Sequence, residues 1–150
     1  MLIDIIHSRE VVAMFIVRVF LGTLFFFQGF DAVFRIKVKG VLDTIEQPLL
    51  EKGLPKIFIE IGAYYTSYVN LIGGFLLIIG FVKYYALYFI GIDILLTAFA
   101  FSVIKSMWDM QFVFPRLMLM IFFLIAPTYW DVISIDYVWS LFKFIRSITY

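Results

Sequence analysis

Three polar side chains lie inside stretches that are otherwise apolar enough to sit in lipid: Arg18, Asn70 and Asp93. A guanidinium and a carboxylate can form an ion pair, and an amide can donate or accept a hydrogen bond beside it. A lone charge at the bilayer centre costs about 2.5–3.5 kcal/mol on insertion scales, so such residues face the interior of a helix bundle and pair. At a rise of ~1.5 Å per residue, the three lie at comparable depths. We therefore predict an ion pair between Arg18 and Asp93, with Asn70 beside it.

Intramembrane polar groups are candidate functional residues by default. They are Arg18, Asn70 and Asp93, and the second apolar stretch adds the two tyrosines Tyr64 and Tyr65. An alternative remains open, in which intramembrane polar groups satisfy one another and only hold a bundle together.

A second polar level is predicted closer to one surface. Gln28, Asp31, Glu60 and Arg116 fall within about two helical turns of the same membrane face. We expect Arg116 to reach Asp31 or Glu60 and the four residues to form a structural polar network. Pro115, directly before Arg116, frees a backbone carbonyl and is expected to bend that helix.

The elements that carry these residues are transmembrane helices. The chain is 64% hydrophobic and only 15% charged, whereas a soluble domain is about half apolar and a quarter charged. Four apolar stretches approach the roughly twenty residues that cross a bilayer, at residues 11–34, 57–81, 84–104 and 111–130. We predict a single all-α domain over residues 1–150, a four-helix transmembrane bundle with both termini on one side. Its glycines are expected to allow close helix packing: Gly22, Gly29, Gly73 and Gly74.

Two further segments have amphipathic character. Within residues 35–56, apolar residues recur at helical spacing, which predicts a helix in the membrane interface. The last 16 residues are too short and polar for a fifth span, and we expect a second interfacial helix with Lys143 and Arg146 facing headgroups. Basic residues are more numerous on the side of the 35–56 connection, so the positive-inside rule places the termini on the non-cytoplasmic side.

Composition argues against several functions. A net charge of +1 gives no basic stripe for nucleic acid. The absence of cysteine excludes a thiolate nucleophile and a cysteine-bound metal or iron–sulfur cluster in this chain. His7 is the only histidine, and a lone histidine lacks the partner ligands of a metal site. We expect no metal, no covalently bound cofactor and no nucleic-acid partner.

Three segments resemble the DoxX family of small four-helix bacterial membrane proteins: RVFLGTLFFFQGFDAVF, the region from EKGLPK to LLTAFAF, and LIAPTYWDVISID. The shared features are an arginine with a glycine four residues later, Gly-Leu-Pro before the second span, a polar residue before a Gly-Gly pair, and a Ser-x-Asp near the end. In this chain they are Arg18 and Gly22, residues 53–55, Asn70 with Gly73 and Gly74, and Ser134 with Asp136. The position before Leu71 is often glutamate in the family and is Asn70 here.

The resemblance implies a function. DoxX relatives are membrane subunits linked to thiosulfate and quinone redox systems and to oxidative-stress complexes. This chain is accordingly expected to be a membrane subunit or accessory of a quinone-linked redox system in the bacterial inner membrane. It would not be catalytic alone; a quinone would be its ligand and other membrane subunits its partners. A quinone site needs hydrogen-bond donors for the carbonyls and aromatic walls, and the resemblance therefore implies ligand-binding roles for Arg18, Tyr64, Tyr65, Asn70 and Asp93. The alternatives are a non-catalytic structural subunit of a larger membrane complex and, less favoured without an inverted repeat, small-solute or lipid transport.

Overall fold

Every secondary-structure element in the computed structural model, which describes residues 9–104 and 110–148, is helical. The elements are α2 (Arg9–Phe30), the π-helical turn η1 (Asp31–Arg35), α3 (Lys37–Glu51), α4 (Lys56–Ile79), α5 (Lys83–Ile104), α6 (Met110–Ile125), the 3-10 turn η2 (Thr128–Trp130) and α7 (Ile135–Ile148). The predicted all-α class is confirmed. His7 lies outside the described residues.

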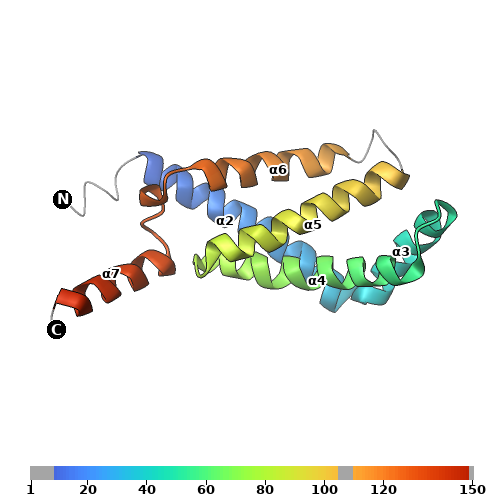
Figure 1. Ribbon diagram of the computed structural model, residues 1–150, viewed down its shortest axis with the longest axis horizontal. Coiled ribbons are helices and arrows are strands. Elements are labelled where there is room, and N and C mark those ends of the chain that lie inside the picture. The colour runs from blue at the N-terminus through green and yellow to red at the C-terminus, as the bar shows by residue number, and fades with distance from the viewer. Residues whose placement is uncertain (1–8, 105–109, 149–150) are drawn as a thin grey trace.

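Four of the helices run alongside one another (Figure 1), in the antiparallel succession α2, α4, α5 and α6. The first of them together with η1, and also α4 and α5, are long and apolar enough to cross a bilayer. The fourth, α6, has 16 residues and reaches ~24 Å, less than the ~30 Å of a hydrocarbon core. At one end of the bundle α3 packs on α4, while α7 projects from the opposite end.

The closest contact in the bundle joins α2 to α4, and glycine makes it possible. A Cβ at Gly29 would collide with the backbone of Asn70 and Leu71, and one at Gly74 with the backbone of Phe26. A Cβ at Gly22 would come within 2.9 Å of the backbone nitrogen of Ile78. Small residues allow this approach, which supplies the van der Waals contact that associates helices in lipid.

The apolar core lies between these four helices. Its largest fully buried apolar side chains come from all of them: Met14, Leu21, Phe25, Leu77, Leu87, Ile90 and Phe123. Large apolar residues also cover the outside of the bundle, where Phe20, Ile72 and Leu95 are each more than half exposed. Since no water-soluble domain leaves so much apolar surface contiguous, this outer surface faces lipid.

The predicted amphipathic segment between the first two spans forms α3. Its buried residues are Val38 and Leu49, and Lys56 Nζ lies 2.8 Å from Glu46 Oε1, which ties α3 to the start of α4. Gly53 adopts φ +85° in the connecting turn, a conformation that favours glycine. The helix predicted within residues 35–56 is therefore α3, which ends at Glu51 before this turn.

Candidate functional site

Buried and half-buried polar residues form two groups at different depths. The first, which we call the end cluster, comprises Arg18, Lys83, Asp131, Ser134 and Asp136 at the end of the bundle near α7. The second, the central cluster, comprises Gln28, Thr66, Asn70, Asp93 and Arg116. The residues predicted to form one site, Arg18 with Asn70 and Asp93, are divided between them.

Arg18 pairs with Asp131 and not with Asp93. Its Nε lies 3.5 Å from Asp131 Oδ1, with both side chains almost fully buried, and its guanidinium donates to the carbonyl of Ile133. The predicted Arg18–Asp93 pair is therefore wrong. Arg18 lies level with Gly80, where α4 ends, whereas Asp93 lies ~15 Å along α5 from Lys83.

Gly80 makes room for Arg18. It ends α4 in the left-handed conformation, with φ +71°, which favours glycine. A Cβ at this position would overlap the Arg18 guanidinium and lie 2.7 Å from Ser134 Cβ. One residue thus reverses the chain between α4 and α5 and leaves space for a buried cation.

Lys83 brings a second cation to the same carboxylate. Its Nζ lies 2.5 Å from Asp131 Oδ2 and 3.1 Å from Ser134 Oγ. The Ser134 hydroxyl in turn donates to the Asp131 carbonyl at 2.9 Å. Because a buried charge is tolerated only when it is paired and hydrogen-bonded, Asp131 is what allows Arg18 and Lys83 to be buried together.

Asp136 fixes the start of α5. Its Oδ1 accepts the N–H of Val82 at 2.8 Å and its Oδ2 accepts the N–H of Lys83 at 3.1 Å, while its own N–H donates to the Gly80 carbonyl at 3.0 Å. A carboxylate at a helix N-terminus satisfies free N–H groups and complements the helix dipole. These bonds hold Val82 at φ +49°, an unusual conformation for a β-branched residue.

The sequence indicates part of the end cluster. Three of its residues belong to the pattern that resembles the family, namely Arg18, Ser134 and Asp136, whereas the sequence analysis does not predict Lys83 and Asp131. The available signal was an acidic residue inside the apolar ending TYWDVISID and a lysine at a span boundary. Neither predicts its partner, because the connection between α6 and α7 has no periodicity to place it.

The central cluster contains polar atoms without partners. Thr66 and Asn70 on α4 lie beside the Asp93 carboxyl group on α5. Asn70 has no exposed surface and Asp93 has 2%, yet both amide atoms of Asn70 and Oδ1 of Asp93 lack a hydrogen-bond partner. A buried polar atom left unpaired costs about 1–3 kcal/mol, so this position either is strained or receives a further hydrogen-bonding group.

Arg116 belongs to this central level. Its guanidinium donates to the side-chain carbonyl of Gln28 and lies over the Phe25 ring at 5.8 Å; its charge also acts on Asp93 at longer range. The expected contacts of Arg116 with Asp31 or Glu60 are not formed.

The two carboxylates instead pair within their own helical segments. Asp31 Oδ1 lies 3.1 Å from Arg35 Nη1, and Glu60 Oε1 lies 3.8 Å from Lys56 Nζ. Of the four residues predicted to form one network, the structure joins only Gln28 and Arg116, by the hydrogen bond between α6 and α2.

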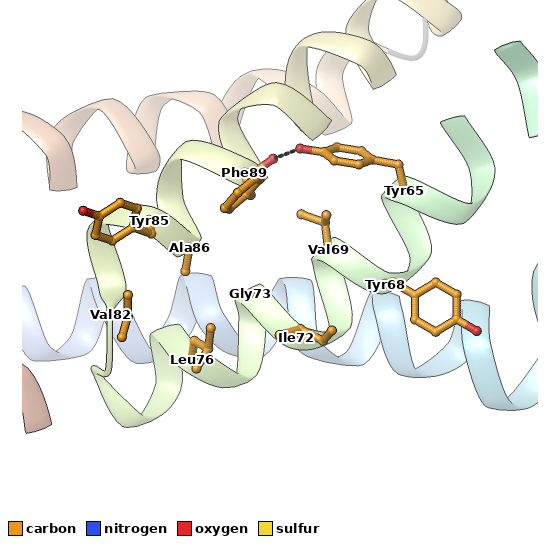
Figure 2. Close-up of a pocket in the computed structure, with 10 residues that line it drawn as sticks. All are labelled: Tyr65, Tyr68, Val69, Ile72, Gly73, Leu76, Val82, Tyr85, Ala86 and Phe89. Atoms are coloured by element: carbon orange, nitrogen blue, oxygen red, sulfur yellow. Dashed lines mark hydrogen bonds between the residues drawn. The ribbon is translucent and has the colours of Figure 1, made fainter. Parts of the chain in front are cut away.

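A groove of about 430 Å³ lies between α4 and α5. Figure 2 shows Tyr65 and Phe89 joined across one end of it, and Leu76 and Val82 near the other. The bond across the end runs from the Tyr65 hydroxyl to the Phe89 carbonyl, at 2.9 Å. The remaining lining residues are apolar or aromatic: Tyr68, Val69, Ile72, Gly73, Tyr85 and Ala86.

The predicted ligand-binding residues differ in their position relative to this groove. Tyr65 lines it and lies close enough to Asp93 for an electrostatic interaction. Asn70 and Asp93 face each other between α4 and α5 but do not line the groove. Tyr64 stacks on Tyr68, with ring centroids 6.5 Å apart, and is 46% exposed. The groove is therefore lined by one of the five predicted residues, Tyr65, and Arg18 and Tyr64 lie away from both Asn70 and Asp93.

The profile of the DoxX family matches residues 13–103, which is more than half of the sequence. The chain belongs to the DoxX family. No curated protein and no solved structure matches it. The matched region includes Arg18 and Lys83 of the end cluster, but Asp131 lies after it. It also includes Asn70 and Asp93 of the central cluster. Family membership and the apolar helices together make this DoxX protein a multi-pass membrane protein.

The two clusters of this DoxX protein differ in chemistry. In the end cluster, Asp131 pairs with both cations and Asp136 caps the start of α5, which suits a structural joint. In the central cluster an amide, a hydroxyl and a carboxyl group converge, and they can both donate to and accept from a small polar group. Within the described part of the chain, no three His, Cys, Asp or Glu side chains are grouped as metal ligands.

Proposed function

We propose that this DoxX protein is a membrane subunit of a quinone-linked redox system in the bacterial inner membrane, and that it binds the quinone in the α4–α5 groove. The observation that supports this proposal is the groove on α4: Tyr65 lines it, and Asn70, which lies on the same helix between the lining residues Val69 and Ile72, has a buried amide without a hydrogen-bond partner. The chain contributes binding, and a partner subunit supplies the electrons.

The groove is accessible from the lipid phase, in which a quinone dissolves. Ile72 on α4 and Phe89 on α5, which face each other across it, are both more than half exposed. Ligand sites are typically apolar and aromatic, with a few polar groups that set the orientation. An isoprenoid tail fits the apolar length of the groove, and the ring fits the aromatic end at Tyr65.

The polar end supplies donors for quinone carbonyls. The Tyr65 hydroxyl, which now donates to the Phe89 carbonyl, would donate instead to the ligand. The unpartnered Asn70 Nδ2 is buried behind the groove lining and becomes available if the ring displaces the lining side chains. One hydrogen bond contributes about 0.5–1.5 kcal/mol net, so two donors would set the orientation of the ring while burial of the tail supplies most of the affinity.

The test is titration of the purified chain in lipid nanodiscs with a short-chain ubiquinone, followed by intrinsic fluorescence quenching. Gly73 lines the groove, and a Cβ there would lie 3.0 Å from the side chain of Ile90. Gly73→Leu therefore fills this part of the α4–α5 contact, and circular dichroism checks that the variant stays folded. Its dissociation constant should rise about tenfold or more, since ~1.4 kcal/mol corresponds to a factor of ten. Gly62→Leu is the matched control on the same helix, because a Cβ there meets nothing within 4 Å. Tyr65→Phe should raise the constant ~3–10-fold by removing one donor. Equal quenching of the parent and Gly73→Leu would contradict the proposal.

A non-catalytic structural subunit is the alternative, and native mass spectrometry of the protein in nanodiscs separates the two. Retention of a quinone by the parent and its loss from Gly73→Leu support the proposed function. A defined protein partner without any quinone would assign the chain to assembly.

A further inference from the structure

The C-terminal helix α7 carries an apolar face outside the bundle. Within its 14 residues, Val138, Trp139, Leu141 and Phe142 fall on one side at helical spacing. All four are exposed, Val138, Trp139 and Phe142 by 60% or more. We call these four residues the α7 face. Figure 1 shows α7 projecting from the end of the bundle, away from the other helices.

The opposite side of α7 is polar. Ser140, Lys143 and Ser147 follow one another at intervals of three and four residues, and the two hydroxyls are satisfied locally by the carbonyls of Tyr137 and Phe144. Lys143 and Arg146 give the exposed turns of α7 a positive charge, because its one carboxylate, Asp136, is occupied by the N–H groups of α5. At 100° per residue, Lys143 lies on the polar side, whereas Arg146 lies beside Trp139 and Phe142. An apolar side flanked by basic residues is typical of helices that lie in a membrane interface.

We propose that the α7 face binds the headgroup and acyl-chain boundary of an anionic lipid leaflet, with Lys143 and Arg146 contacting lipid phosphates. Two observations favour this occupant. The basic residues complement an anionic surface, and the helix begins at the end cluster, where Asp136 joins it to the first residues of the membrane-spanning α5. The α7 face is thus continuous with the part of the chain that already contacts lipid. The inference is independent of the proposed quinone site.

Hydrogen bonds of Asp136 and Ser134 attach the start of α7 to the bundle. Asp136 accepts two N–H groups of the α4–α5 turn and donates its own to Gly80, and Ser134 accepts the N–H of Tyr137 at 3.3 Å and that of Lys83 Nζ at 3.1 Å. These contacts fix only the first turn. The remaining turns carry the exposed apolar residues and are the part that would settle on lipid.

The absence of cysteine from the chain allows a direct test. Phe142→Cys on the α7 face and Ser140→Cys on the polar side are each labelled with an environment-sensitive fluorophore. The full chain is reconstituted in vesicles of phosphatidylcholine, with or without phosphatidylglycerol. The label at position 142 should shift to shorter wavelength and be quenched by lipids that carry a quencher on the acyl chain, whereas the label at position 140 should be quenched by aqueous iodide.

The charge contribution is tested separately in the same vesicles. Lys143→Glu with Arg146→Glu should reduce lipid quenching at position 142 several-fold with phosphatidylglycerol and change it little with phosphatidylcholine alone. Both changes lie on exposed turns, and circular dichroism checks that the bundle stays folded. Equal iodide access at positions 140 and 142 would overturn the proposal. Protection that requires a high protein-to-lipid ratio would overturn it too, and would assign the α7 face to a second copy of this chain.

Discussion

At the residue scale, the pairing of buried charges distinguishes a structural joint from a candidate binding site. Asp131 lies between Arg18 and Lys83, and each of these cations loses its ion-pair partner if Asp131 is removed. Asn70 is buried to a similar degree, but its side chain is neutral and both of its amide atoms lack a hydrogen-bond partner. Arg18 Nε and Asp131 Oδ1 also lack a hydrogen bond, yet their opposite charges lie 3.5 Å apart. The ion pairing of the buried groups, more than their burial, therefore separates the two clusters.

Arg18 should couple energetically to Asp131 and not to Asp93. In a double-mutant cycle, Arg18→Leu combined with Asp131→Asn should show a coupling free energy of about 1–3 kcal/mol, because the two side chains form one buried pair. The same cycle with Asp93→Asn should give less than about 0.5 kcal/mol, since the two sites have no shared partner. Thermal unfolding of the four variants in detergent measures both. Strong coupling to Asp93 would place Arg18 in the central cluster and contradict the geometry.

At the element scale, the turn between α4 and α5 connects the end cluster to the groove. Val82 lines the groove, and its N–H is held by Asp136 from the far end of the sequence. Gly80 lets the chain reverse there while Arg18 fills the space above it. The first turn of α7 thus positions one end of a groove that it does not line.

Asp136→Ala should loosen this turn. The loss of the two caps on Val82 and Lys83 is expected to cost about 0.5–2 kcal/mol of stability, the usual range for removal of a helix N-cap. Asp136→Asn keeps one acceptor and should cost less. Unfolding midpoints in detergent give the ranking of the two variants, and quinone titration shows whether the groove changes with the turn. Identical midpoints for the parent and both variants would mean that the carboxylate does not hold α5.

At the scale of the whole molecule, the long apolar stretches predicted the helices, and a single-helix depth estimate predicted that Arg18, Asn70 and Asp93 are buried. It did not predict their partners. Depth along one helix does not give the offset between two helices, which is set here by backbone contact at Gly29 and Gly74. Asp131 was missed for a related reason, because it lies in the irregular chain between α6 and α7 and no period places it. The burial of these side chains was thus predictable from the sequence, whereas their partners depend on how the helices pack.

The arrangement of the helices predicts on which side of the membrane each end of the bundle lies. Because α3 and α7 lie at opposite ends of helices that cross the bilayer, Lys39→Cys and Ser147→Cys should react with an impermeant maleimide from opposite sides of the membrane. Both positions are exposed, and the chain has no other cysteine. Since the basic residues favour a cytoplasmic α3, position 147 should label in intact spheroplasts and position 39 only in inverted vesicles. The reverse pattern would keep the fold and invert the orientation, whereas labelling of both positions from one side would contradict the fold itself.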